Sequence, residues 1–258
     1  VQADGTSVGS VFSARGELLK TSGTRTYPVG YSYDSQGRMK FMTNWSGFSA
    51  GSGSRVTAWH YHAYRGWLTN KVYNDGNGTK YAYTAAGRLE NRLWARGTNT
   101  AYAHNYFGDL SGISYNDGAT PTVAYTYDRR GRQKTSSKGT DSWKFFYTAN
   151  NQLVSEAGTA GTLNGLRVTN SFDEFLRRTN VATADGATER TRNGYSYDLA
   201  GRLSVARNGE FSAAYSYVAN SPLLSQIEFK SNSVVRMVTR KSYDKLNRLS
   251  SIASTYSN

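Results

Sequence analysis

Aromatic and polar residues alternate along short stretches of this chain, and each stretch ends at a turn signal. In residues 31–33 (Tyr-Ser-Tyr), both rings lie on one face of an extended strand and the serine on the other. Asp34 follows, where a short side chain accepts hydrogen bonds from backbone N–H groups and starts a turn. Gly37 stands where a left-handed residue closes a type I turn with a G1 bulge. The pattern predicts a β-hairpin whose return strand begins at Arg38.

The same sequence, Tyr-x-Tyr-Asp-x-x-Gly-Arg, occurs at residues 31–38, 125–132 and 195–202. Residues 81–89 lack only the Asp, and residues 243–249 carry Asn247 in place of Gly, as expected where positive φ is needed. Weaker copies occupy 12–18, 147–153, 172–178 and 217–223, and two copies with a shortened turn occupy 64–68 and 106–110. The anchoring aromatic residues are then residues 12, 33, 64, 83, 106, 127, 147, 172, 197, 217 and 243, which are 19 to 31 residues apart. These repeats fill the chain.

Each repeat is interpreted as one hairpin, because short turn signals also occur between repeats, at 74–76, 116–118, 184–186 and 208–209. We expect the Arg to pair with the turn Asp or to lie across a Tyr ring, for about 0.5–1 kcal/mol if exposed. The sequence thus predicts an all-β fold, a single array over residues 1–258 of about eleven tandem hairpins. The positions that define the repeat are Tyr33, Asp34, Gly37, Arg38, Tyr83, Gly87, Arg88, Tyr127, Asp128, Gly131, Arg132, Tyr197, Asp198, Gly201, Arg202, Tyr243, Asp244 and Arg248.

Composition supports strands and tight turns. The chain has 20 Tyr, 10 Phe and 5 Trp, which suit a pleated surface, and 26 Gly against 3 Pro. It has no Cys, so it contains neither a disulfide nor a Cys-ligated metal site. It opens at Val1 without a leader-like segment, which is typical of a mature or excised part of a larger protein. No apolar run approaches the roughly 18 residues that span a bilayer.

The full-length repeats and their spacing resemble the YD repeats of Rhs proteins, of the BC cocoon of insecticidal toxin complexes, of wall-associated proteins and of teneurins. The resemblance covers essentially the whole chain. It implies a curved or spiralling antiparallel β-sheet strip that forms part of a hollow shell, often around a C-terminal toxin. It also implies a bacterial secreted or cell-surface protein. Such repeats have, in addition, been associated with carbohydrate binding.

The chain departs from a complete Rhs shell. Such shells end in a self-cleaving segment with paired Asp-Pro sequences, whereas none of Pro28, Pro121 and Pro222 follows an Asp. Eleven hairpins are also few for a closed cocoon. The chain is therefore either a piece of a larger shell or a short open array used for binding.

The net charge of +13 attracts polyanions, without selecting among nucleic acid, acidic polysaccharide and anionic surfaces. Basic and aromatic residues are interleaved in two clusters, and a third stretch near Trp143 is purely basic. A Trp face flanked by guanidinium groups can hold a sulfated or uronic sugar. The alternative is an aromatic ladder covered by Arg stems. No nucleic-acid reader motif occurs, so nucleic acid ranks below glycan. The candidate glycan or polyanion residues are Trp59, Tyr64, Arg65, Trp67, Arg92, Trp94, Arg96 and Trp143, and on a strand Arg92, Trp94 and Arg96 would share a face.

Catalytic signatures are weak. His60 and His62 have the spacing of two metal ligands on a strand face, with His104 as a distant third, but ordinary packing histidines are favoured. No nucleophile elbow occurs, and most Asp residues are used by turns, so a pair of carboxylates for glycoside hydrolysis has no spacing signal. We expect no metal, no cofactor and no catalytic residue.

Three functions follow, in order of preference. The first is a non-catalytic scaffold, a shell segment that encloses or presents another protein, with other YD segments or a toxin domain as partners. The second is a carbohydrate-binding module for acidic or sulfated polysaccharides. The third is a polysaccharide lyase or hydrolase.

Overall fold

The computed structural model of the chain describes residues 4–47 and 52–256, which form 22 β-strands, one short 3-10 helix and no α-helix. The strands are antiparallel and pair in a meander, each with its neighbours in sequence. The prediction of an all-β strip of tandem hairpins is confirmed. The chain divides into two compact units, residues 1–124 and 125–258, and each is described by itself. That the chain is one array without a domain boundary stays a prediction.

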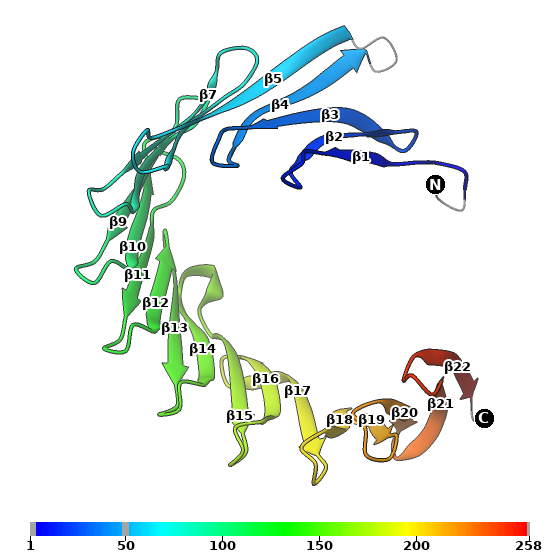
Figure 1. Cartoon of the computed structure of the whole chain (residues 1–258). Helices are drawn as coiled ribbons and strands as arrows, with labels where there is room; N and C mark the ends of the chain where they lie inside the picture. The colour runs from blue at the N-terminus through cyan, green and yellow to red at the C-terminus, as the bar shows by residue number, and fades with distance from the viewer. Residues whose placement is uncertain (1–3, 48–51, 257–258) are drawn as a thin grey trace. The chain divides into compact units, whose positions relative to one another are not determined.

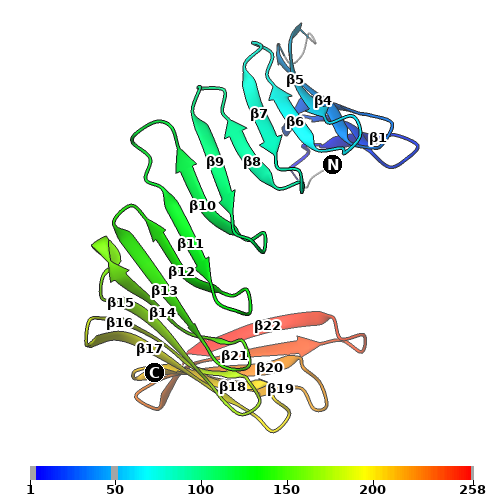
Figure 2. The same cartoon turned by 90° about the vertical axis from the view of Figure 1, so that its left-hand side faces the viewer.

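The first unit carries the strands that Figure 1 colours from blue to green, and Figure 2 shows β6 to β10 side by side in chain order. Its strands are β1 (Gly9–Phe12), β2 (Leu18–Gly23), β3 (Thr26–Tyr33), β4 (Met39–Gly47), β5 (Ser52–Tyr61), β6 (Leu68–Val72), β7 (Gly78–Tyr83), β8 (Leu89–Leu93), β9 (Asn99–His104) and β10 (Leu110–Tyr115).

The second unit begins inside β11 (Val123–Tyr127). Its other elements are β12 (Gln133–Lys138), β13 (Asp141–Tyr147), β14 (Leu153–Ala160), η1 (Gly161–Leu163), β15 (Leu166–Phe172), β16 (Arg178–Asp185), β17 (Thr188–Tyr197), β18 (Leu203–Asn208), β19 (Phe211–Tyr217), β20 (Leu224–Ser231), β21 (Val234–Tyr243) and β22 (Leu249–Tyr256).

The turn that follows each repeat tyrosine has the predicted geometry. The N–H of Asp34 donates to the carbonyl of Arg38 at 2.9 Å, and the N–H of Gly37 donates to the carbonyl of Asp34 at 3.0 Å. Gly37 has a φ of 76°, and the pairing register of β3 with β4 shifts between Ser32 and Tyr33, which is the expected bulge. Asn247, which replaces Gly in the last repeat, has a φ of 61°. The predictions for the turn glycine and for its asparagine substitute are confirmed.

The sheet has a single layer. Ala182 is the one hydrophobic residue, among those that the structure describes, that is classed as buried. Most other strand residues are half-buried, because within each unit the strands pack mainly against their neighbours in the same sheet. A compact β-sandwich would bury the inner faces of two sheets. The stability of this fold must therefore come from contacts between successive hairpins, as in other repeat proteins.

No helix in the described part of the chain is long and apolar enough to cross a membrane.

Candidate functional site

The first part of the repeated contact between hairpins is made by a tyrosine that ends an outgoing strand. Its hydroxyl donates to the backbone carbonyl of the residue that starts the return strand of the preceding hairpin. Tyr33 donates to Leu18 at 2.9 Å, and Tyr83 donates to Leu68 at 2.9 Å. In the remaining cases the donors are Tyr61, Tyr147, Tyr197, Tyr217 and Tyr243. One hydrogen bond, geometrically the same each time, thus ties each of these hairpins to its predecessor.

The hairpin that ends in Phe172 has no hydroxyl to donate. Asn170, two residues earlier on the same strand face, donates its amide to the carbonyl of Leu153 at 3.1 Å. Leu153 starts the return strand of the preceding hairpin, so its carbonyl is the equivalent acceptor. Asn170 is buried, at 9% exposure, and it supplies the contact that the phenylalanine cannot make.

The second part of the contact is the turn aspartate. One oxygen of Asp128, Oδ1, accepts from the backbone N–H groups of Arg130 and Arg132. The other oxygen, Oδ2, accepts from Nε of Arg132 at 2.7 Å. The same Asp–Arg pair occurs in five repeats, at Asp34, Asp128, Asp173, Asp198 and Asp244 with the Arg four residues later. Each carboxylate therefore closes its own turn and holds the arginine in place.

The third part is the stacking of that arginine on the next hairpin. The guanidinium carbon of Arg38 lies 4.4 Å from the ring centre of Tyr61, and that of Arg202 lies 4.3 Å from Tyr217. Arg202 also donates to the carbonyl of Ser221 at 2.6 Å, in the next turn. The sequence predicts that the Arg pairs with the turn Asp or lies across a Tyr ring, and in these repeats it does both. We call this Tyr–Asp–Arg–Tyr chain of contacts the repeat ladder.

The ladder lowers the pKa of its carboxyl groups. The Arg38 side chain lowers the pKa of Asp34 below its ordinary value of 3.8, and Arg132 does the same for Asp128. For Asp198 and Asp244, the hydrogen bond from the backbone N–H of the paired arginine is the largest contribution to the lowered pKa. A lowered pKa stabilises the fold at pH values above the unfolded value and loses this effect as the pH falls through the folded value.

We therefore expect thermal stability to be flat from pH 7 to about pH 5 and to fall below about pH 4, where these aspartates bind protons in the unfolded chain more readily than in the fold. Thermal unfolding followed by circular dichroism across this range measures the effect. The control is a protein with Asp34→Asn, Asp128→Asn and Asp198→Asn, which should be less stable at pH 7 and should lose less on acidification. An equally steep acid limb in this control would contradict the assignment.

Other residue types occupy the arginine position in some repeats and still reach the next hairpin. Trp67 stands there after Gly66, and its ring lies 5.2 Å from that of Tyr83. Gln152 stands there after Asn151 and donates to the carbonyl of Leu176 in the next turn at 2.8 Å. In these two repeats a side chain other than arginine makes the bridge between two turns, so charge is not essential for it.

The structure corrects two repeat assignments. Tyr64 and Tyr106 are not anchors: they lie in turns, 95% and 96% exposed. The anchors are Tyr61, whose hydroxyl donates to the carbonyl of Met39, and His104, the last residue of β9. Neither turn is shortened. The turn from His62 to Trp67 is one residue longer than the common turn, and the turn from Asn105 to Asp109 has the common length. The error arises because each of these turns contains an aromatic residue that resembles the anchor. With the corrected anchors, the spacing narrows to 20 to 28 residues.

His104 lacks the hydroxyl that would reach the carbonyl of Leu89, which starts the preceding return strand. We expect His104→Tyr to complete the ladder at this hairpin and to raise the free energy of unfolding by about 1 kcal/mol. Urea denaturation measures the change. The same substitution at His60, which lies within β5 away from a turn, is the control and should give no gain. A loss of stability in His104→Tyr would contradict the equivalence of this position with the anchors.

His60 and His62 do not lie on one strand, as the metal-ligand spacing assumed. His60 lies in β5, whereas His62 opens the following turn. Nδ1 of His62 accepts from the N–H groups of Tyr64 and Arg65, both at 3.3 Å, and so takes the place of a turn aspartate. Within residues 4–47 and 52–256, no group of three or more His, Asp or Glu residues has an arrangement that holds a metal ion.

The predicted Trp–Arg face on a strand is wrong in its geometry. Only Arg92 lies on β8, because the strand ends at Leu93 and Trp94 and Arg96 lie in the turn. The turn nevertheless brings the three side chains together, with the guanidinium carbons of Arg92 and Arg96 lying 3.6 and 5.6 Å from the centre of the Trp94 ring. Trp94 also donates from Nε1 to Thr100 at 2.8 Å.

The other predicted binding residues are distributed along the chain. Arg65 lies 4.7 Å from the Trp67 ring and donates to the carbonyl of Ala85 at 2.8 Å, so it bridges two turns. Trp59 lies on β5, with Lys71 over its ring at 5.3 Å. Trp143 lies on β13 in the second unit, with its Nε1 3.4 Å from Glu156. Whether these residues bind a ligand stays a prediction.

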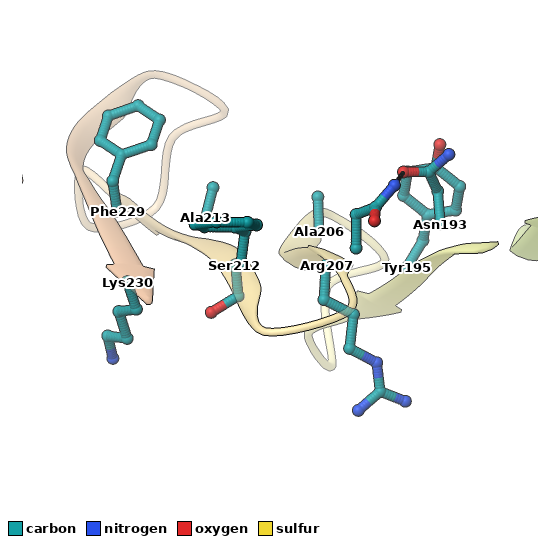
Figure 3. A pocket seen from close by; sticks show the side chains of 10 residues that line it. Asn193, Tyr195, Ala206, Arg207, Ser212, Ala213, Phe229 and Lys230 are labelled. Carbon is teal, nitrogen blue, oxygen red and sulfur yellow. Dashed lines mark hydrogen bonds between the residues drawn. The ribbon is translucent and has the colours of Figure 1, made fainter. Parts of the chain in front are cut away.

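A hollow that the sequence did not indicate lies on the second unit. Its volume is about 350 Å³, and Figure 3 shows Tyr195, Ala206, Ala213 and Phe229 rising from one face of the sheet around it. Its complete lining is Asn193, Tyr195, Ala206, Arg207, Asn208, Phe211, Ser212, Ala213, Phe229 and Lys230.

With the architecture in place, the chain can be compared with known proteins. The sequence matches no protein-family profile and no curated relative. Among solved structures, the crystal structure of TcdB2-TccC3-TEV matches over 94% of this chain with a TM-score of 0.55 and 12% identity. The Photorhabdus luminescens Tc holotoxin pore, with a substituted TccC3, matches over 96% with a TM-score of 0.51 and 11% identity. The chain shares the fold of a segment of these proteins. It spans only 16% and 17% of their chains.

Proposed function

We propose that the chain is a non-catalytic scaffold, a wall segment of an Rhs-like shell that encloses or presents another protein. The observation that carries the proposal is the repeat ladder on a single-layered sheet: contacts of the same kind join successive hairpins, and among the described residues only Ala182 is a buried hydrophobic residue. A strip of this kind covers a large area with a short length of chain. The fold match to the toxin proteins supports the same reading.

The ionisable groups give no support to the enzymatic alternative. The described carboxyl groups with a shifted pKa have it lowered, each by hydrogen bonds that close a turn or pair it with an arginine. A general acid for glycoside hydrolysis needs the opposite, a raised pKa. The contacts of the repeat-ladder carboxylates with turn N–H groups and arginines therefore support a structural role for them.

The scaffold proposal is tested on the full product of the gene that encodes this chain. Proteinase K is expected to leave both the hairpin strip and an enclosed segment intact, as judged by mass spectrometry of the surviving fragments. Replacing Arg38, Arg132 and Arg202 with alanine weakens the ladder and should make the enclosed segment susceptible first. If every segment outside the strip is digested equally fast in the unsubstituted protein and in the triple-alanine variant, no segment is enclosed.

A second candidate, a module that binds acidic or sulfated polysaccharide, is favoured by the two guanidinium groups on Trp94 and by the net charge of +13. Affinity electrophoresis in gels containing heparin or polygalacturonate tests it. The expected result is retardation that weakens from about 50 to about 500 mM salt and that Trp94→Ala reduces. Phe107→Ala, in the next turn and 83% exposed, is the control. Migration unchanged by any polyanion would remove this candidate.

A further inference from the structure

The hollow on the second unit is built from two adjacent rows of side chains on one sheet face. In the first row, the pairing register sets Tyr195 opposite Ala206, Ala206 opposite Ala213, and Ala213 opposite Phe229. The row thus has a ring at each end and two methyl groups between them. Because neighbouring strands lie about 4.8 Å apart, the two ring-bearing backbones are roughly 14 Å apart. The alanines form the floor of a trough, and the rings form its walls.

The second row adds polar groups and a third ring. Asn193 lies opposite Asn208, and Asn208 lies opposite Phe211. Nδ2 of Asn208 donates to Oδ1 of Asn193 at 2.9 Å. This bond leaves the Asn193 amide with free N–H donors and the Asn208 amide with a free carbonyl acceptor. If Asn193 donated to Asn208 instead, one free donor group and one free acceptor would still remain. The ring of Phe211 is 58% exposed.

No charged side chain faces the trough. Arg207 and Lys230 belong to its lining, but their side chains leave the sheet on the opposite face (Figure 3). Lys230 is also paired there with Glu228 at 3.0 Å. The strip is basic as a whole, so a surface that selects anions would be expected to present Arg207 and Lys230. In this trough both side chains lie on the opposite face of the sheet. The trough therefore suits a neutral ligand.

We propose that this trough binds a neutral saccharide. The apolar C–H face of a pyranose ring packs on an aromatic side chain, and the three rings supply such surfaces. Two neighbouring hydroxyl groups of a sugar offer one acceptor and one donor, which match the free donor of Asn193 and the free acceptor of Asn208. The volume, about 350 Å³, lies at the lower end of the range of about 300–1,000 Å³ for small-ligand sites. An apolar side chain of a partner protein would cover the rings but leave both amides unused.

This site is separate from the acidic-glycan candidate, whose Trp94 cluster lies in the first unit and depends on charge. It is also independent of the scaffold proposal, because a shell wall needs no ligand. The three proposals can therefore fail separately.

The test is isothermal titration of the whole chain with maltohexaose, cellohexaose, xylohexaose and mannohexaose, at about 50 and about 500 mM NaCl. At least one of these neutral sugars is expected to bind with a Kd in the millimolar range or tighter, and the Kd should change less than about twofold with salt, since no charge pair contributes. Phe211→Ala and Asn193→Ala should each weaken binding about tenfold or more. Ala213→Phe, which fills the floor, should abolish it.

Matched controls keep the test specific. Phe146→Ala removes a ring that is 51% exposed on β13, outside the trough, and Arg207→Gln removes the cation on the opposite face. Both should bind as the unsubstituted chain does, and thermal melts confirm that every variant is folded. The proposal is overturned if none of the four sugars binds or if Phe211→Ala binds normally. Binding of a leucine- and phenylalanine-rich peptide in the absence of sugar binding would also overturn it, in favour of protein docking.

Discussion

Tyr61→Ala is expected to lower the free energy of unfolding by about 3 kcal/mol, one of the largest effects of a single side-chain truncation in the first unit. Three interactions disappear together: the hydrogen bond to the carbonyl of Met39 at 2.8 Å, the stacking of Arg38 on the ring at 4.4 Å, and the area that the ring covers between two hairpins. Burial also raises the pKa of the Tyr61 hydroxyl. Urea denaturation measures the loss.

Two companion substitutions separate these contributions. Tyr61→Phe keeps the ring and loses only the hydroxyl, so we expect a cost of about 1 kcal/mol. Tyr64→Ala removes a tyrosine three residues away that is 95% exposed in the turn, and it should change stability by less than about 0.5 kcal/mol. Comparable losses for Tyr64→Ala and Tyr61→Ala would mean that the corrected anchor assignment is wrong.

The sequence was sufficient to predict the hairpin and its turn because both are local. Asp34, Gly37 and Arg38 lie within five residues, and their roles follow from turn geometry and from the reach of an arginine side chain. Even the asparagine in the last repeat could be interpreted, since the left-handed conformation admits few residue types.

The misplaced anchors show where local reasoning fails. In residues 61–68 and 104–110, an aromatic residue inside the turn resembles the anchor more closely than the true one does. Only the partner carbonyl on the previous hairpin distinguishes Tyr61 from Tyr64, and that carbonyl is 22 residues away in sequence. Counting back four residues from the turn glycine, as from Gly37 to Tyr33, leads to His104 in the second segment but to His62 in the first, because that turn is one residue longer.

The trough illustrates a stronger limit. Its residues come from four strands, and none of them belongs to a recognisable motif. They meet because the register sets Ala206 opposite Ala213, between Tyr195 and Phe229. A register shift of one residue would send each of these side chains to the other face, so the site depends on a pairing that the sequence alone does not define.

Gly87→Ala is expected to destabilise the first unit by about 2–5 kcal/mol. Gly87 has a φ of 82°, so any other residue adopts a left-handed backbone there, at a cost of about 1–2 kcal/mol. A β-carbon at this position would also lie 2.7 Å from Cζ2 of Trp67, which is held between the turn and the ring of Tyr83 and has little room to move. Overpacking of this kind adds about 1–3 kcal/mol.

Gly97→Ala isolates the contribution of backbone strain. Gly97 closes a turn with the same hydrogen bonds as Gly87 and has a φ of 88°, and a β-carbon added there would have no atom within 4 Å. Its cost should therefore be the backbone strain alone, about 1–2 kcal/mol. In a protein that already carries Trp67→Ala, Gly87→Ala should cost no more free energy of unfolding than Gly97→Ala does, because the ring that crowds the new β-carbon is gone. If Gly87→Ala and Gly97→Ala cost the same in urea denaturation, then Trp67 does not bridge to the next turn, and the proposal that this position links successive hairpins fails at that repeat.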